Sequence, residues 1–432
     1  MKPRAILAVG AIGALAYGFP GYLNFDSAVQ LSQARLGRYD DWHPPMMARY
    51  WRITDQFFHG PLPLFVLQIA LFVWGTYGIL RMRFSPRASA IATVLILWFP
   101  PVLAPMAAVW KDAQMAGWLV AGTMLLLRPS ARARIGGIVM LILACAVRDN
   151  ALAALPSLLF VAAYYAAVRG TFRRVAVAIV GLVVIAGTAR LADAYYTDSH
   201  AYPWVQANAI HDIAGTLCYA PRLSDEEVTK LLDGVELLKH DSLQARFCAD
   251  YNPRWWFALS YDDARLFSVT PSEAERAART AAYVRLVKTY PLAFATHRWN
   301  VTRELLGLGD TTPDEPVVQS FAGSPAQAEK VFTSGSLSKL QRVVGRKFLA
   351  MSETMWFRPW VYLLIGLCML GYAIAKRDGL VAALVTSGIT YEASFALAAA
   401  GAPYRYSHWM IFTCCLAAVI VVGERYRQGR AR

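Results

Sequence analysis

The stretch GYLNFDSAVQLSQARLGRYDDWHPP, residues 21–45, follows directly on the first apolar run of the chain. It carries three carboxylates, Asp26, Asp40 and Asp41, and ends in the turn Trp42-His43-Pro44-Pro45. Connections between packed helices are usually only a few residues long. We therefore expect this long, polar connection to carry chemistry, and the rest of the chain to be organised around it.

The composition places the chain in a membrane. It has 432 residues, of which 56% are hydrophobic and 17% charged, whereas about 25% are charged in soluble proteins. Lys and Arg total 43 against 29 Asp and Glu, but the positive charge falls in short clusters between apolar runs. That is the pattern of topology signals, so the expected partner is the lipid bilayer and not a nucleic acid.

A membrane span needs about 20 apolar residues. The sequence predicts about ten spans, at 4–20, 62–80, 88–108, 113–127, 135–151, 152–168, 174–192, 359–375, 380–400 and 408–424. The predicted fold class is therefore an all-α polytopic membrane protein. The first run lacks a small-x-small cleavage site, so we expect it to stay as an uncleaved span.

Threading the spans alternately puts the basic clusters on one side: Lys2/Arg4, Arg81/Arg83/Arg87, Arg128/Arg132/Arg134, Arg169/Arg173/Arg174, Lys376/Arg377 and Arg425/Arg427/Arg430/Arg432. By the positive-inside rule this side is the cytoplasm, with both termini in it. The expected location is the plasma (inner) membrane of a bacterium. The unusual polar residues then face the extracytoplasmic side.

Three regions are predicted. Residues 1–192 form a membrane module whose first outer loop, 21–60, contains amphipathic helices at the interface. Residues 193–358 form a mostly helical extracytoplasmic domain, because Ser224-Asp225-Glu226-Glu227 and Thr270-Pro271-Ser272-Glu273 are helix-start patterns of soluble type. Residues 359–432 form a second membrane module.

Cysteine usage agrees with this arrangement. Cys218 and Cys248 lie in the predicted outer domain, and the other cysteines lie in apolar runs. Disulfides form in oxidising outer compartments, so we predict that this pair is bonded. The alternative is two buried free thiols. The sequence contains no CxxC, Walker, Rossmann or HExxH motif.

Four short segments carry a resemblance to a known family: Pro20-Gly21-Tyr22-Leu23-Asn24-Phe25-Asp26-Ser27, Asp41-Trp42-His43-Pro44-Pro45, Trp110-Lys111-Asp112 and Arg148-Asp149-Asn150. In these the chain resembles the GT-C glycosyltransferases, such as aminoarabinose transferases and protein O-mannosyltransferases, which use polyprenyl-phosphate sugars. The resemblance covers the first 150 residues; the remainder matches in layout only. It implies an aspartate of the first outer loop acting on the acceptor, a lipid groove between helices, and basic residues on the donor phosphate.

Asp26 has two readings. It can be the N-cap of a helix that ends near Gly37, because Asp is favoured at helix starts. It can also be the base that takes the acceptor proton, a role that needs a carboxylate or imidazole near the acceptor hydroxyl. The two roles are compatible. With the resemblance, we predict that Asp26 is catalytic.

The neighbouring residues of the loop are expected to bind substrate. Asp40 reads as part of a solvated turn, whereas Asp41 adjoins the segment Trp42-His43 that two prolines stiffen. His43 can donate to phosphate, assist the base or cap a loop carbonyl. Asn150 is a further candidate for substrate binding.

The basic residues are candidates for the donor phosphate. Lys111 and Arg148 could hold the charge that develops on the departing phosphate, or could be ordinary charged residues at span ends. Asp112 is a second catalytic candidate, and it could join Asp26 around a divalent cation such as Mg²⁺ or Mn²⁺. Arg405, between Tyr404 and Tyr406 and near His408, could complete a phosphate or sugar site; tyrosines also occur in interfacial belts for other reasons.

The predicted function is transfer of a sugar from a polyprenyl-phosphate donor to an extracytoplasmic glycan, lipid or protein. One alternative is an outer-face glycan ligase or polymerase, in which a late Arg such as Arg405 would be catalytic. The other is a transporter or flippase, which would place its substrate site at the bilayer midplane between paired halves.

Overall fold

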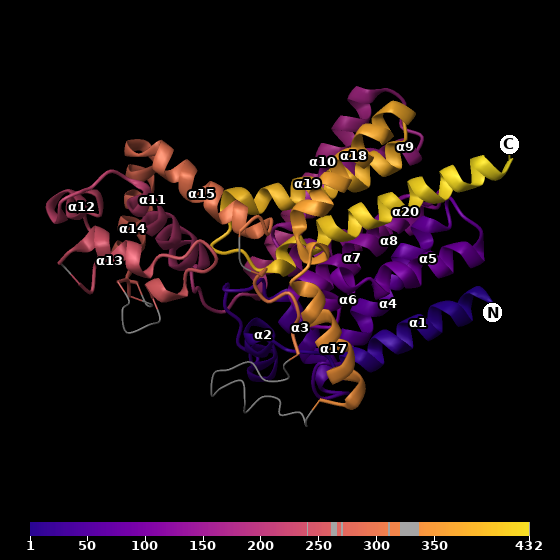
Figure 1. Ribbon diagram of the computed structural model, residues 1–432, viewed down its shortest axis with the longest axis horizontal. Coiled ribbons are helices and arrows are strands. Elements are labelled where there is room, and N and C mark those ends of the chain that lie inside the picture. The colour runs from indigo at the N-terminus through magenta and orange to yellow at the C-terminus, as the bar shows by residue number, and fades with distance from the viewer. Residues whose placement is uncertain (240, 261–265, 269–270, 310–311, 320–336, 432) are drawn as a thin grey trace. The chain divides into compact units, whose positions relative to one another are not determined.

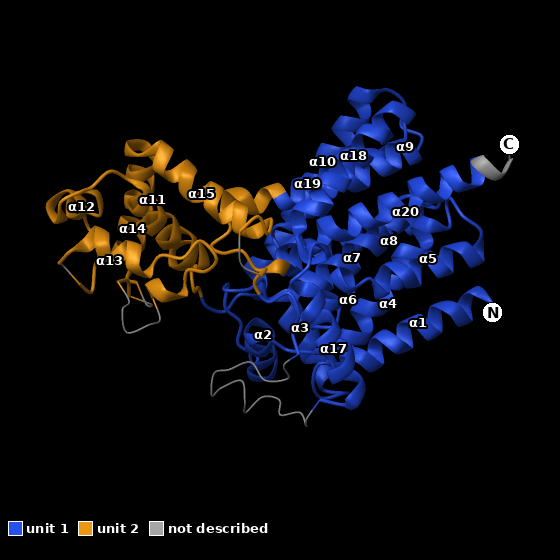
Figure 2. Ribbon diagram, viewed as in Figure 1, with its two compact units in different colours: residues 1–199, 315–392, 405–432 blue, residues 200–314, 393–404 orange. Residues whose placement is uncertain are grey.

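The structure is a computed structural model, and it describes residues 1–431 apart from 240, 261–265, 269–270, 310–311 and 320–336 (Figure 1). Within these residues the regular structure is helical, and β-pairing is limited to isolated bridges. The chain forms two compact units (Figure 2): unit 1 comprises residues 1–199, 315–392 and 405–432, and unit 2 comprises 200–314 and 393–404. The predicted all-α class is confirmed for the described residues.

Unit 1 is built from long helices with short connections. They are α1 (Pro3–Gly18), α2 (Phe25–Leu36), α3 (Met46–Asp55), α4 (Leu62–Leu80), α5 (Pro86–Trp98), α6 (Pro100–Met106), α7 (Lys111–Leu126), α8 (Ala131–Val147), α9 (Ala151–Tyr165), α10 (Thr171–Tyr196), α17 (Lys339–Ser352), η3 (Met355–Phe357), α18 (Pro359–Lys376), most of α19 (Gly379–Ala398), most of η4 (Tyr404–Ser407), and α20 (His408–Ala431). Each predicted apolar run coincides with a helix to within several residues, except 88–108.

The run 88–108 is broken into α5 and α6, which meet at a bend of 72°. The cause is Pro100-Pro101, because proline has no N–H for the helical ladder and disfavours helical geometry in the residue before it. Phe99 accordingly has extended backbone angles, φ −64° and ψ 119°.

Five helical segments are long and apolar enough to cross a membrane: Leu62–Leu80, Thr171–Tyr196, Pro359–Lys376, Gly379–Ala398 and Tyr404–Gln428. A sixth is added if α5 and α6 count as one bent span. The apolar faces of α10 are open; Val180 and Val183 are 62% and 64% exposed. Apolar helices with exposed apolar side chains suit a lipid environment. The fold is that of a polytopic membrane protein, and the predicted number of about ten spans stays a prediction.

The centre of unit 1 is α7, which packs between α4 and α8. Small residues permit close contact there: a Cβ on Gly137 of α8 would meet the backbone of α7 at Gly122 and Leu126. Close approach at small residues is the usual means by which membrane helices gain packing energy. Almost all of α7 is consequently buried.

A hydrogen-bond network fixes the turn that precedes α7. The buried Gln68 side chain of α4 donates to the carbonyls of Met106 (2.8 Å) and Ala108 (3.0 Å). The backbone of Tyr22 pairs with the same turn, accepting from Val109 N at 2.8 Å and donating to Ala107 at 3.1 Å. Residues 22 and 107–109 are therefore joined, and the start of the 21–60 loop is tied to the start of α7.

The 21–60 loop contains the two predicted short helices, α2 and α3. The N-cap of α2 is Asn24, whose side chain accepts from Ser27 N, and the helix ends at Gly37 with φ 69°. The predicted cap role of Asp26 is wrong: Asp26 lies in the first turn and leaves capping to Asn24. Arg35 of α2 binds Asp55 of α3 at 2.8 and 3.1 Å, which joins the two helices.

Unit 2 is a cluster of shorter helices. They are η1 (Trp204–Ala209), α11 (Ile210–Tyr219), α12 (Asp225–Leu231), α13 (Leu243–Asp250), η2 (Phe257–Leu259), α14 (Glu273–Thr289) and α15 (Pro291–Leu305). Helix α11 packs against α13, α14 and α15. A disulfide joins Cys218 of α11 to Cys248 of α13, with their Cα atoms 5.1 Å apart. This is the pair that the sequence predicts.

Several predicted boundaries differ. Helix α10 continues to Tyr196, and α17, placed by the sequence in the outer domain, packs in unit 1 against α1 and α6. Its capping box begins at Ser338. Helix α14 is capped by Ser272, since Ser272 accepts from Glu275 N, and Thr270 lies outside the described residues. The predicted capping box at Ser224 and Glu227 is present.

Candidate functional site

Five charged side chains from distant segments of unit 1 meet at one place. We call Asp26, Lys111, Asp112, Arg148 and Arg405 the charge cluster. Asp26 lies in the first turn of α2, Lys111 and Asp112 begin α7, Arg148 follows α8, and Arg405 lies in η4. The three cations are only 7–8% exposed and Asp112 is fully buried. Burying charges is costly even when they are paired, and charged groups within a membrane protein are usually functional, so the grouping is a candidate functional site.

Arg405 is the central member of the charge cluster. Its Nη2 donates to Asp26 Oδ2 at 2.5 Å, and its Nε lies 3.7 Å from Asp112 Oδ2. The two carboxylates thus flank one guanidinium. A divalent cation shared by Asp26 and Asp112 would compete with Arg405 for the same oxygens.

Arg148 supports the other side of Asp112. Its Nε lies 3.2 Å from Asp112 Oδ1, and its guanidinium carbon lies 4.7 Å from the centre of the Tyr406 ring. Arg405 in turn lies over the ring of Trp110, at 4.9 Å. Guanidinium groups stack well on aromatic faces, so these rings hold both arginines in fixed orientations.

Lys111 reaches Asp26 through His43. Lys111 Nζ lies 2.7 Å from His43 Nδ1, and His43 Nε2 lies 3.7 Å from Asp26 Oδ1. In its ammonium form Lys111 can only donate, and Nδ1 then accepts. The proton of the neutral ring is then on Nε2, facing Asp26. His43 connects the cation at the start of α7 to the carboxylate of α2.

The electrostatics set the protonation states of the two loop residues. Burial raises the pKa of Asp26, but the charge of Arg405 and the other cations nearby outweighs burial and holds the pKa well below its usual range. Burial together with the Lys111 charge lowers the pKa of His43 to about 3. At neutral pH Asp26 is therefore a carboxylate and His43 is a neutral ring.

The charge cluster has hydrogen-bonding capacity that the protein does not use. Among the described residues, Nη1 and Nε of Arg405 have no hydrogen-bond acceptor although both atoms are buried. An unused buried donor costs about 1–3 kcal/mol, and more for a charged group. Nη1, and Nε with only the ion-pair contact to Asp112 at 3.7 Å, are donors beside Lys111 and Arg148 that suit an anion with several oxygens, such as a phosphate.

The structure brings together most of the predicted site residues: Asp26, His43, Lys111, Asp112, Arg148 and Arg405. Asp40, expected in a solvated turn, is half-buried instead; its side chain accepts from Trp42 N at 3.0 Å and its backbone forms an isolated bridge with Ser199. Asp41, Trp42 and Asn150 are half-buried, and their role in substrate binding stays a prediction.

One residue near the charge cluster was missed from the sequence. Glu392 of α19 is 5% exposed and accepts from Ser407 Oγ at 2.8 Å, in the segment that carries Arg405. It is an acidic residue inside the apolar run 380–400. An ionisable side chain within an apolar span is by default a functional candidate. The position of Glu392 in an apolar run is therefore sufficient to select it from the sequence.

Comparisons with known proteins add limited information. No family model matches the chain, and no curated protein matches it. Among solved structures, the chain is similar to the crystal structure of ArnT from Cupriavidus metallidurans bound to undecaprenyl phosphate. The similarity covers 98% of this chain and 77% of that one, at 13% identity and a TM-score of 0.36.

Proposed function

We propose that the chain transfers a sugar from a polyprenyl-phosphate donor to an extracytoplasmic acceptor, with the charge cluster as its active site. The observation that carries the proposal is Arg405: a buried guanidinium with two unused donors, flanked by two carboxylates and accompanied by Lys111 and Arg148. One cluster thus contains both cations that can stabilise an anionic leaving group and a carboxylate that can accept a proton.

The reaction is a single displacement at the anomeric carbon. The acceptor hydroxyl gives its proton to Asp26, and its oxygen bonds to the anomeric carbon. The bond from that carbon to the phosphate oxygen breaks, and the electron pair leaves with the polyprenyl phosphate. Arg405, Lys111 and Arg148 stabilise the negative charge that this oxygen gains. Fixed cations in a site of low dielectric are effective in this role.

The depressed pKa of Asp26 is compatible with proton transfer once the donor is bound. A base works best when its pKa is near the working pH, and Arg405 holds the pKa of Asp26 far lower. A phosphate bound to Arg405 would offset that positive charge, and a nearby negative charge raises the pKa of a carboxyl group. The donor would thereby prepare the base for the acceptor.

Asp26→Asn tests the proposal. Asn24 caps α2, so the change removes the proton acceptor without removing the cap. We expect transfer to fall by about 10² or more, measured as product glycan by mass spectrometry in a deletion strain that carries the variant. Binding of a synthetic polyprenyl phosphate, followed by native mass spectrometry, should persist.

A matched control is Asp241→Asn, because the Asp241 side chain is 73% exposed and pairs with Arg246 on unit 2. Normal glycan from Asp26→Asn, at equal membrane abundance, contradicts the proposed role of Asp26. An equal loss of glycan from Asp241→Asn would show that the assay measures the amount of folded protein and not catalysis by Asp26.

A second candidate, an outer-face glycan ligase or polymerase, is favoured by the central place of Arg405, which comes from a late segment of the chain. The two candidates differ at Asp26. Loss of activity in Arg405→Lys with normal activity in Asp26→Asn supports the ligase.

The possible Mg²⁺ or Mn²⁺ stays a proposal with its own test. Chelation that abolishes transfer, followed by recovery with Mg²⁺ or Mn²⁺ and not with Zn²⁺, supports a hard-cation site of oxygen ligands. Full activity in chelator contradicts it.

A further inference from the structure

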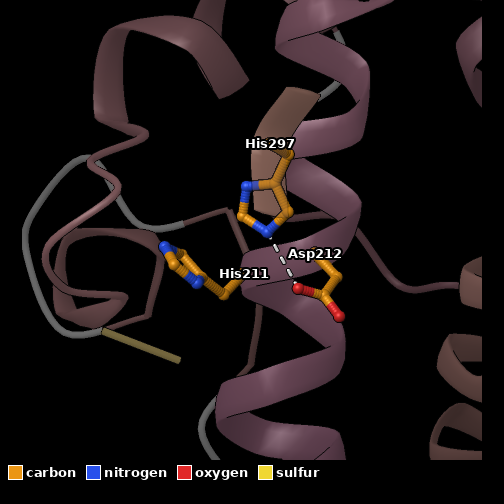
Figure 3. Close-up of side chains that lie close together, drawn as sticks. All are labelled: His211, Asp212 and His297. Atoms are coloured by element: carbon orange, nitrogen blue, oxygen red, sulfur yellow. Dashed lines mark hydrogen bonds and ion pairs between the residues drawn. The ribbon is translucent and has the colours of Figure 1, made fainter. Parts of the chain in front are cut away.

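Unit 2 contains a second buried polar cluster that the proposed reaction does not use. We call His211, Asp212 and His297 the histidine cluster. His211 and Asp212 lie in the first turn of α11, and His297 lies in α15. Both histidines are 0% exposed and Asp212 is 3% exposed. Figure 3 shows the His297 ring facing the Asp212 carboxylate, joined by the Nε2–Oδ1 hydrogen bond of 2.8 Å, with the His211 ring beside them.

Each histidine has one ring nitrogen engaged on the side away from its partners in the cluster. His211 Nε2 lies 2.9 Å from the Asn252 carbonyl oxygen, which can only accept. The proton of His211 is therefore on Nε2, and Nδ1 carries a lone pair. Among the described residues, Nδ1 has no hydrogen-bond partner although it is buried.

His297 has a similar arrangement. Its Nδ1 lies 2.8 Å from the Tyr251 hydroxyl, which can accept a proton from that nitrogen. In the structure Nε2 instead donates to Asp212 Oδ1 at 2.8 Å, so it becomes a ligand only when the proton of the ring is on Nδ1, toward the Tyr251 hydroxyl. Metal-binding histidines typically donate their other ring N–H to a carbonyl, carboxylate or similar acceptor, which fixes the tautomer. His211 and His297 both have such an acceptor.

Asp212 completes the set. Arg298 Nη2 donates to Asp212 Oδ2 at 2.9 Å, which orients the carboxylate and leaves Oδ1 toward His297. One ligand atom from each of His211, Asp212 and His297 lies within 4.8 Å of the other two. Around a tetrahedral zinc with bonds of about 2.0–2.2 Å, ligand atoms are about 3.3 Å apart. Side-chain rotations that bring the ligand atoms closer by about 1.5 Å at most close the difference.

The surrounding structure is arranged to bring these side chains together. A Cβ at Gly215, one turn after His211, would clash with the His297 ring, so the glycine is what permits the approach of α15 to α11. The Cys218–Cys248 disulfide holds α13 on α11. Tyr251 and Asn252, which contact the two histidines, follow α13 directly.

We propose that His211 Nδ1, His297 Nε2 and Asp212 Oδ1 bind one divalent ion of the zinc class, joining α11 to α15. Two imidazoles and one carboxylate in a buried site suit zinc, with the fourth position left to water or a small anion. The hydrogen bond from His297 to Asp212 gives way to two bonds to the metal. The ring proton of His297 changes place from Nε2 to Nδ1, and the Tyr251 hydroxyl turns to accept a hydrogen bond from it. The competing account is a network of hydrogen bonds that binds no metal.

The test uses the full-length chain without a histidine tag, in detergent. After incubation with Zn²⁺ and dialysis, we expect about one zinc per chain by mass spectrometry of the metal. With Co²⁺ as the probe, we expect the intense visible bands of a tetrahedral centre. Wild-type protein without bound zinc and without these bands overturns the proposal, whatever the variants do.

Three variants locate the site. His211→Asn and His297→Asn should each lose the bound metal, whereas His200→Asn, at an exposed histidine of the same unit, should retain it. Tyr251→Phe keeps the ring and removes the hydroxyl that supports His297, so zinc affinity should fall by about 10- to 100-fold. Equal zinc in wild type, His211→Asn and His297→Asn overturns the assignment.

Discussion

The charge cluster of unit 1 and the histidine cluster of unit 2 are both buried and polar, but they differ in charge: cations outnumber carboxylates in the first, and neutral rings surround one carboxylate in the second. The first combines three cations with two carboxylates; N–H donors of Arg405 make no hydrogen bond there, and the Asp112 oxygens, which make none either, are in ion pairs with Arg148 and Arg405. The second combines imidazole lone pairs with a carboxylate and has an unused acceptor at His211 Nδ1. Unused donors suit an anion and unused acceptors suit a cation. The buried atoms without hydrogen-bond partners therefore indicate the ligand of a polar cluster better than its residue types do.

The comparison predicts that each cluster can be disabled without affecting the other. The largest effect is expected for Arg405→Ala, which removes the partner of Asp26 and a partner of Asp112. Sugar transfer should fall by about 10³, with polyprenyl-phosphate binding weakened and zinc content unchanged. Loss of zinc from a well-folded Arg405→Ala variant would contradict the independence of the two clusters.

Arg405→Lys guards against misfolding in that experiment. It keeps the charge opposite the carboxylates but loses the planar fork. We expect a folded protein with transfer reduced by about 10², and wild-type transfer from this variant would show that charge alone is needed.

The disulfide makes the next largest difference, because only the histidine cluster of the two has a covalent link beside it. Replacing Cys218 and Cys248 by Ser opens a loop with a sequence separation of 30. We expect a loss of about 3–4 kcal/mol of stability and weaker zinc binding, with transfer retained below the new melting temperature. Cys368→Ser, at an exposed free cysteine, is the control and should be silent. Unchanged thermal unfolding of the double variant contradicts the prediction.

Lys111 sharpens the account of the charge cluster. Lys111→Ala should reduce transfer by about 10² because one stabiliser of the leaving phosphate is lost, and Lys111→Arg should recover part of it. Lys347→Ala, at an exposed position of α17, is the matched control. Normal glycan yield from Lys111→Ala would return Lys111 to the class of ordinary charged residues at helix ends.

The smallest effect concerns pH. The pKa of His43 is lowered from 6.5 to about 3 in the folded protein, so between these values the unfolded chain binds the extra proton. The stability that this shift contributes is complete above about pH 7.5 and decreases as the pH falls, by about 1.4 kcal/mol at pH 5.5. His43→Asn should abolish this part, making the drop in Tm between about pH 7.5 and 5.5 smaller by 1–2 °C or so. An equal drop in both proteins contradicts the prediction.

The helices of this chain were readily predicted because an apolar run is a local property. The break at Pro100 was equally local, since proline chemistry alone explains it, but a hydropathy count passes over it. Asp26 is a good N-cap for α2 by residue type, but Asn24, two residues earlier, has an equally good capping side chain. Choosing between them requires the position of the first helical turn, and boundaries are the least certain part of a sequence-based assignment.

The sites were predictable in membership but not in geometry. Asp26, Lys111, Arg148 and Arg405 could be selected as charged residues at the ends of apolar runs, yet nothing local states that Arg405 meets Asp26, which is 379 positions away. His297 and Asp212, separated by 85 positions, follow no ligand spacing in the sequence. Such contacts depend on the packing of α15 on α11 and on features such as Gly215, which acquires its meaning only in three dimensions.

The capping of α2 by Asn24 has a practical consequence. Because the residue that starts the helix is not the residue proposed to take the proton, Asp26→Asn provides a folded chain in which the carboxylate is exchanged for an amide of nearly the same shape. Donor and acceptor could then occupy the protein together without being consumed. That would allow a ternary complex to be captured by cryo-electron microscopy and the sugar and acceptor to be identified from their density.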